Sequence, residues 1–299
     1  MSSNNAFENG RSQTALRALA SRRSTRAVRF LSAMARQTPL FGKAPHGRYR
    51  AQTADRANAE LDHAIFPIVS QEPSGVFVPI GTGFFIAKNG VFVTAAHVVK
   101  AVLDENGSPT RPFGLFQFLP DGHYCVRQIH RATRHLVADV AVGVAMPMHH
   151  NETGKPMPNK ILTIASNPPP VGSAVCTYAY PKTIIEPGKP QVVRFEPGFY
   201  DGIIIEHLPY GRDQVLLPGA CFHTSMVVHG GASGGPVVGP NGTAFAINST
   251  GFDNDTISYV SCISQVLDLA IPGVILPGNA TPQSVTVREL QDRGFVPSR

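Results

Sequence analysis

The chain has 299 residues, of which 42% are apolar and 15% charged, so it can bury the core of one or two domains. The net charge of +6 is uneven: residues 1–60 hold 11 basic and 3 acidic residues (net +8), and the remainder holds 15 basic and 17 acidic ones (net −2). The overall charge therefore gives no indication of a basic groove on the folded part. No apolar run approaches the roughly 18–20 residues of a membrane span, and no apolar core of a secretory signal is present near the N-terminus.

Residues 1–60 are rich in Arg, Ser and Ala, and we expect them to form a basic, mostly disordered arm. Two alternatives stay open. The same composition is typical of a mitochondrial import sequence, and a basic arm can also dock on nucleic acid or anionic lipid. We favour a cytoplasmic bacterial protein, with a mitochondrial import precursor as the alternative, and expect nucleic acid to bind, if at all, only through the arm.

From about residue 63 onward, short β-type runs alternate with turn residues. Asn89-Gly90 and Asp121-Gly122 are typical of hairpin turns. The segments that we predict in the first half are a hairpin at 81–99, a second hairpin at 113–129, a strand at 137–145 and a polar linker at 146–159.

The second half again consists of short strands, followed by short predicted helices at 264–271 and 284–293. Many short strands with frequent turns and a central linker favour an all-β fold of two small antiparallel barrels. The expected parts are the arm (1–60), an N-terminal barrel (61–150), a C-terminal barrel (151–275) and a C-terminal tail (276–299).

One serine, Ser233, lies in the glycine-rich stretch HGGASGGPVVG. A serine hydroxyl is a weak nucleophile that needs a base to take its proton and donors to hold the oxyanion. Gly231 and Gly234 permit a tight turn that can aim the N–H groups of Gly231 and Ser233 at one point. The stretch therefore predicts a nucleophile loop with its own oxyanion hole.

A base and an orienting acid are found upstream. His97 ends the apolar run VFVTAAHVV, where the small residues before it leave room for the ring. Asp139 is the single acid of VADVAVGVA, and a His N–H is a suitable partner for a partly buried carboxylate. Asp104 and Asp121 remain as alternatives, although both lie in turn-like, polar stretches.

In the order His, Asp, Ser, the segments GTGFFIAKNGVFVTAAHVV, ADVAV and GGASGGPVVG resemble the trypsin/chymotrypsin-like serine proteases. The resemblance is nearest to the bacterial and organellar HtrA-type branch, and it covers residues 63–272. It implies two six-stranded barrels, with Ser233 as nucleophile, His97 as general base and Asp139 as orienting acid. It implies no cofactor and no metal.

The resemblance also implies a substrate cleft, in which a peptide or unfolded protein adds a strand along Asn248, Ser249 and Thr250. Ser249 is also a candidate to bond Asp139. Val227 stands where trypsin-like relatives carry the acidic floor of the specificity pocket, which predicts a small or medium apolar residue before the cleaved bond. His229, beside Gly230, lies near the rim of that pocket, where it either faces solvent or favours an acidic residue.

Three departures from the family pattern limit what can be carried over. Ala232 replaces the aspartate that pairs with a freshly cut N-terminus in digestive relatives, so activation by that ion pair is impossible. Val98 replaces a cysteine that usually forms a disulfide. After the region of resemblance about 25 residues remain, too few for a PDZ domain.

The remaining polar motifs are assigned structural roles. The four cysteines lack metal-finger spacing, so we expect buried thiols in a reducing compartment. A glycan at the Asn248 sequon would block the expected cleft, which argues against secretion. We interpret His149-His150 as linker residues, and Asp253 and Asp255 as a solvated loop rather than a calcium site.

The alternative function is a catalytically inactive, protease-fold protein whose cleft binds peptides or partners while its arm docks on an anionic polymer or lipid. An intact set of Ser, His and Asp argues against it, since an inactive relative is free to lose one member. The sequence leaves the oligomeric state and the natural substrate undetermined.

Overall fold

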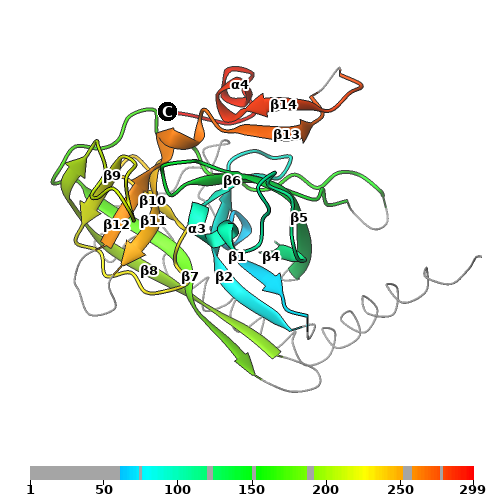
Figure 1. Ribbon diagram of the computed structural model, residues 1–299, viewed down its shortest axis with the longest axis horizontal. Helices are drawn as coiled ribbons and strands as arrows, with labels where there is room; N and C mark the ends of the chain where they lie inside the picture. The colour runs from blue at the N-terminus through cyan, green and yellow to red at the C-terminus, as the bar shows by residue number, and fades with distance from the viewer. Residues whose placement is uncertain are drawn as a thin grey trace, which may run out of the picture.

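The computed structural model describes residues 61–73, 76–119, 124–149, 153–186, 192–251, 258–276 and 279–299. The predicted arm (1–60), the turn at Asp121-Gly122, His150, Asp253 and Asp255 lie outside these ranges. Within them the chain forms two closed, six-stranded antiparallel barrels, as the sequence predicts (Figure 1). None of the described helices has the length and apolar character that crossing a bilayer requires.

The first barrel closes in the order β1-β2-β3-β6-β5-β4. Its strands are β1 (Ile65–Gln71), β2 (Phe77–Phe85), β3 (Val91–Thr94), β4 (Phe113–Phe118), β5 (Tyr124–Arg134) and β6 (Ala141–Ala145). The second barrel closes in the order β10-β11-β12-β9-β8-β7. Its strands are β7 (Ala174–Glu186), β8 (Val192–Leu208), β9 (Cys221–Thr224), β10 (Pro236–Val238), β11 (Ala244–Gly251) and β12 (Ser258–Cys262).

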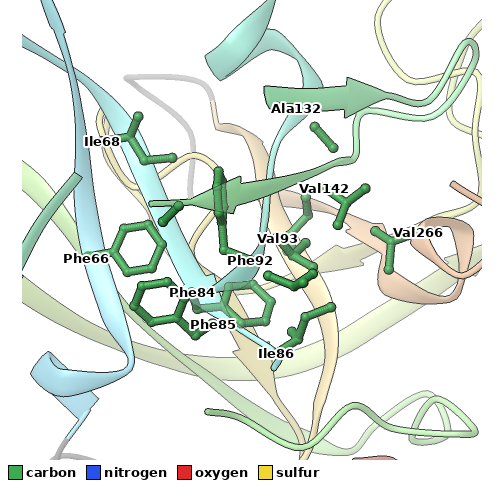
Figure 2. Close-up of a cluster of buried hydrophobic side chains, with 14 of the residues drawn as sticks. Phe66, Ile68, Phe84, Phe85, Ile86, Phe92, Val93, Ala132, Val142 and Val266 are labelled. Atoms are coloured by element: carbon green, nitrogen blue, oxygen red, sulfur yellow. The ribbon is translucent and has the colours of Figure 1, made fainter. Parts of the chain in front are cut away.

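Aromatic rings fill the core of the first barrel. Phe66 lies with its ring centroid 4.5 Å from that of Phe85 and 5.7 Å from that of Phe92, in tilted and edge-to-face arrangements (Figure 2). All three side chains are fully buried. Such pairs stabilise the core beyond the burial of their area, so this cluster fixes how β1, β2 and β3 pack.

The predicted hairpin at 81–99 forms, but its second strand ends at Thr94, and helix α3 (Ala96–Lys100) follows. The apolar pattern of this run suggested a longer strand. Val98 and Val99 are buried in the helical turn instead, and Val98 packs so closely over Gly81 that a side chain there would clash. His97 therefore stands on a short helix and not at a strand end.

The predicted strand at 137–145 begins only at Ala141. The ring nitrogen Nδ1 of His135 accepts hydrogen bonds from the N–H groups of Val137 and Ala138, at 3.1 and 2.8 Å. The chain closes this loop by donating from the N–H of His135 to the carbonyl of Val140. Asp139 is thus held in a compact loop rather than in the sheet.

Arg127 is buried, and among the described residues its hydrogen-bond partners include no carboxylate. Its guanidinium donates to the carbonyl of Met146 and to the side chains of Gln117 and Asn159, and it lies 5.2 Å from the ring centroid of Phe85. Burial lowers the pKa of Arg127. Asn159 also donates to the carbonyl of Lys88, so these contacts fasten both ends of the linker to the first barrel.

Where a helix at 264–271 was predicted, the structure has a short 3-10 helix η3 (Ile263–Val266) and then strand β13 (Ala270–Val274). β13 pairs with β14 (Gln283–Thr286), and α4 (Val287–Asp292) follows, in agreement with the second predicted helix. The described fold begins with a further 3-10 helix, η2 (Leu61–His63).

The C-terminal residues are part of the fold. In Figure 1, β13 lies beside β6 of the first barrel, and β14 and α4 lie on the other side of β13. Thr133 in β5 donates to the carbonyl of Ala270, and the backbone of Ile164 exchanges hydrogen bonds with Pro297 and Arg299. β13, which lies within the predicted C-terminal barrel, is thus bonded to the first barrel. The region predicted as a tail pairs with β13 through β14 and is bonded to the segment between the barrels.

None of the four cysteines, all of which lie in the described part of the chain, forms a disulfide. Cys176, Cys221 and Cys262 are buried as expected, whereas Cys125 is only partly buried. Burial raises the pKa of Cys176 and of Cys221.

We expect Phe85→Ala to lower the free energy of unfolding by about 3–5 kcal/mol, because it removes a ring from the centre of the aromatic cluster. Urea denaturation followed by circular dichroism measures this loss. Leu136→Ala is the matched control, since Leu136 is 100% exposed and should change stability by less than about 0.5 kcal/mol. Equal losses in the two variants would contradict the described core.

We expect one cysteine of the native protein, Cys125, to react with a disulfide reagent at pH 8 well before the other three, because thiolate formation requires access to water. Reagent titration before and after unfolding counts the two classes. Cys125→Ala should abolish the fast phase. A fast phase that survives in this variant would place an accessible thiol elsewhere.

Candidate active site

His97 and Asp139 are joined twice in the first barrel. His97 Nδ1 lies 2.8 Å from Asp139 Oδ2, and the backbone N–H of His97 donates to Asp139 Oδ1 at 2.9 Å. A carboxylate only accepts, so Nδ1 is the donor of this bond and carries a proton. The His97 side chain is 46% exposed and that of Asp139 is 10% exposed. The carboxylate of Asp139 is thus shielded from solvent, while the His97 ring is partly exposed to it.

The alternative acid Asp104 is occupied elsewhere. Its Oδ1 accepts the N–H groups of Asn106 and Ser108, at 2.9 and 2.8 Å, so it caps its own turn. Asp121, the other alternative, lies outside the described residues.

Ser233 lies in the loop between β9 and β10 of the second barrel. Gly231 and Gly234 adopt positive φ angles of 88° and 86°, which favour glycine. The N–H of Gly235 donates to the carbonyl of Ala232 at 2.9 Å and that of Gly234 to the carbonyl of Asn248 at 2.7 Å. These bonds hold the loop in a sharp turn.

Thr82 of β2 fastens this loop to the first barrel. Its N–H donates to the carbonyl of Ser233, and its hydroxyl donates to the carbonyl of Gly231, both at 2.9 Å. A Cβ on Gly234 would run into the Thr82 carbonyl and the Thr94 hydroxyl. Sequence reasoning missed Thr82, since nothing in GTGFF marks a threonine that bonds a loop about 150 residues away.

Ser249 of β11 bonds both barrels at once. Its hydroxyl donates a short hydrogen bond to Asp139 Oδ2, and its carbonyl accepts the hydroxyl of Ser233 at 3.2 Å. Among the described residues, this carbonyl is the hydrogen-bond partner of Ser233 Oγ, and no hydrogen bond joins that hydroxyl to His97. The predicted Ser249–Asp139 contact is therefore present.

The N–H groups of Gly231 and Ser233 were predicted to form an oxyanion hole. Within the described part of the chain, neither N–H donates to a protein acceptor. Both are thus available to a ligand, because the internal bonds of the loop use the N–H groups of Ala232, Gly234 and Gly235 instead.

A cavity of about 290 Å³ opens beside Ser233. Its lining residues are Val228, His229, Gly230, Ser233, Asn248, Ser249, Thr250, Ser258 and Tyr259. Val227, predicted as the pocket floor, is not among them and is 42% exposed; the wall is formed by its neighbour Val228, whose N–H donates to Ser258 Oγ. His229 is exposed and meets the ring of Tyr200 edge-on at 5.9 Å.

Asn248 supports the nucleophile loop. Its side chain is buried and donates to Thr177 Oγ1 and to the carbonyl of Ala232. Its own N–H and carbonyl bond Gly235 and Gly234. Both backbone groups are therefore used, which leaves Ser249 and Thr250 as the part of the predicted edge that can pair with a peptide.

No three His, Cys, Asp or Glu side chains of the described residues gather closely enough to hold a metal ion. His149 forms a bridge with Pro156 in the linker.

The sequence profile of the trypsin-like peptidase domain matches residues 81–247, and the chain belongs to this family. Its fold resembles that of Deg5, with 18% identity over 73% of this chain and 92% of that chain and a TM-score of 0.52. The active form of the Rv3671c protease from M. tuberculosis matches 69% of this chain and 78% of that chain, at 18% identity and a TM-score of 0.47. No curated protein sequence matches the chain.

We expect Gly234→Ala to unfold at a clearly lower temperature than the parent, because a Cβ combines a strained positive φ with contact against Thr82 and Thr94. Differential scanning calorimetry measures the shift. Gly230→Ala is the control for stability, since a Cβ at Gly230 meets nothing within 4 Å. If both variants melt alike, the close approach of the barrels at Gly234 is wrong.

Proposed function

We propose that the protein is a serine endopeptidase in which Ser233, His97 and Asp139 act as nucleophile, base and orienting acid. The observation that carries this proposal is that Ser249 bonds both Asp139 and Ser233, which ties the His97–Asp139 pair to the nucleophile loop. The shared motifs and the Deg5-like fold support membership of the HtrA-type branch.

In the proposed reaction, Ser233 Oγ bonds to the carbonyl carbon of the scissile peptide and gives its proton to His97 Nε2. The π-electron pair of that carbonyl moves onto its oxygen, which the N–H groups of Gly231 and Ser233 stabilise. Asp139 keeps the ring oriented and stabilises its cation. Removing one donor of an oxyanion hole typically costs about 100- to 1000-fold in kcat.

The tetrahedral intermediate collapses when the C–N bond breaks and the leaving amine takes the proton from His97. The remaining acyl group is an ester of Ser233. Water then repeats the sequence: it attacks the ester carbonyl, gives a proton to His97, and the Ser233 oxygen recovers that proton as the acid leaves. No step consumes a cofactor or metal.

The substrate we propose is a peptide or unfolded segment that extends along Ser249 and Thr250. Among the described residues, those that line the cavity beside Ser233 include no Asp, Glu, Lys or Arg, so they offer no fixed charge to select a charged residue. This supports an uncharged side chain before the cleaved bond. We further propose that the two barrels are two domains, bounded at 61–150 and 151–275, with the cleft between them.

Ser233→Ala should abolish labelling by a fluorophosphonate probe and lower peptide hydrolysis by at least about a thousandfold, since the nucleophile is lost. Gel fluorescence and an internally quenched peptide measure the two effects. Ser166→Ala, an exposed serine in the segment between the barrels, should keep both signals. Labelling that persists in Ser233→Ala would refute the assignment.

A further inference from the structure

A cavity of about 340 Å³ is lined by the end of β4 in the first barrel and by the linker that leaves this barrel. It shares no lining residue with the cavity beside Ser233. Its volume falls within the range of about 300–1,000 Å³ in which proteins bind small ligands. The proposed reaction at Ser233 makes no use of this cavity.

The wall of this cavity is mostly apolar. Rings, aliphatic chains and thioethers from three parts of the chain meet there: the end of β4, the residues after β6, and the linker. The apolar lining residues are Phe118, Leu119, Met148, Pro156, Met157 and Pro158.

The β4 side of the wall is held by aromatic packing. The ring of Phe118 stacks on that of Tyr180, with 6.1 Å between the centroids, and meets that of Phe195 edge-on at 6.3 Å. Both partners belong to the second barrel, in β7 and β8. Phe118 is therefore positioned by the packing of the two barrels and not by its own strand alone.

The linker side of the wall is fastened by hydrogen bonds. The N–H of Met157 donates to the carbonyl of Met148 at 2.8 Å, and the N–H of Asn159 donates to the carbonyl of Lys88 at 3.0 Å. The side-chain amide of Asn159 donates to the same carbonyl of Lys88. The cavity is thus bounded by bonded or packed residues on both sides.

The buried polar side chains of the wall are already engaged. Gln117 is 3% exposed; its Oε1 accepts from Arg127, and its Nε2 donates to Asn159 Oδ1 at 3.2 Å. His63, the other one, also has an interaction within the chain. A buried peptide would need partners for the N–H and C=O of each residue. A hydrocarbon chain needs none, so it fits this wall better.

Positive charge surrounds the apolar wall. Lys155 and Lys160 line the cavity and are exposed, so their aliphatic stems can cover apolar surface while the ammonium groups stay in water. Arg127 adds a buried positive charge one hydrogen bond behind Gln117. Among the described residues, those that line the cavity include no Asp or Glu. The charge therefore favours an anionic group at the exposed side of the cavity.

We propose that this cavity binds a monocarboxylate with an aliphatic chain, of the class of medium-chain fatty acids. The chain packs between β4 and the linker, and the carboxylate lies at Lys155 and Lys160. The site is separate from the candidate active site, so the inference does not rest on the proposed function. Because such a ligand contacts both the barrel and the linker, its binding stabilises the folded protein.

Calorimetric titration of the full chain with sodium hexanoate, heptanoate and octanoate at pH 7 tests the apolar part of the site. Each added CH₂ should tighten binding about fourfold, because each is removed from water. The uncharged control, 1-octanol, should bind about tenfold more weakly than octanoate, because it lacks the charge. Affinity that is independent of chain length, or equal for alcohol and carboxylate, would overturn the proposal.

Single lysine variants test the place of the carboxylate. Lys155→Gln and Lys160→Gln should each weaken octanoate binding about threefold or more and leave 1-octanol binding unchanged. Lys100→Gln is the matched control, since Lys100 is an exposed lysine on α3 and does not line the cavity. Octanoate should also raise the melting temperature of the parent more than that of the two cavity variants.

Two outcomes of the variant experiment contradict the site. An equal loss of affinity in Lys100→Gln would show that octanoate responds to the overall charge and not to this cavity. A full-length chain that binds no octanoate, because residues 1–60 or a second copy of the chain fill the cavity, would overturn the proposal as well. Neither outcome changes the labelling of Ser233, which tests the proposed function.

Discussion

The contact between Gly234 and Thr82 is the constraint on which the site depends. The two barrels approach so closely there that a Cβ on Gly234 would meet the Thr82 carbonyl, the Thr94 hydroxyl and the N–H of Ala95. Thr82 then bonds the carbonyls of Gly231 and Ser233. Because the loop of the second barrel is bonded to a strand of the first, the position of Ser233 relative to the first barrel follows from the backbone.

Each barrel supplies part of the polar groups of the candidate site. The first barrel supplies an imidazole whose ring nitrogen and backbone are both held by Asp139. The second supplies the Ser233 hydroxyl, the N–H groups of Gly231 and Ser233, which bond no acceptor of the described residues, and the bulged residue Ser249. Thr82 and Ser249 both bond across the two barrels, so the geometry of the candidate site is a property of the interface and not of either barrel alone.

Local rules failed where tertiary contacts compete with them. The run around His97 was predicted as a strand, but it forms helix α3, in which Val98 packs over Gly81. The strand after Asp139 begins later than predicted, because the N–H of Ala138 donates to the ring of His135. Where a helix was predicted at 264–271, the chain forms η3 and β13. The prediction of Val227 as the pocket floor stays a prediction; its neighbour Val228 lines the cavity beside Ser233. Each error is a shift of a few residues, the distance over which a packing contact outweighs propensity.

The sequence by itself predicted the two-barrel fold and the family, and it proposed Ser233, His97 and Asp139 as candidates, because turn residues, strand periodicity and motif order are local properties of the chain. Only the tertiary structure decided three contacts. Thr82 bonds the nucleophile loop, Asn248 donates to Thr177 and to that loop, and Ser233 donates to the carbonyl of Ser249. These are contacts between residues far apart in the chain. Their partners are chosen by how the barrels pack, which no short stretch of sequence specifies.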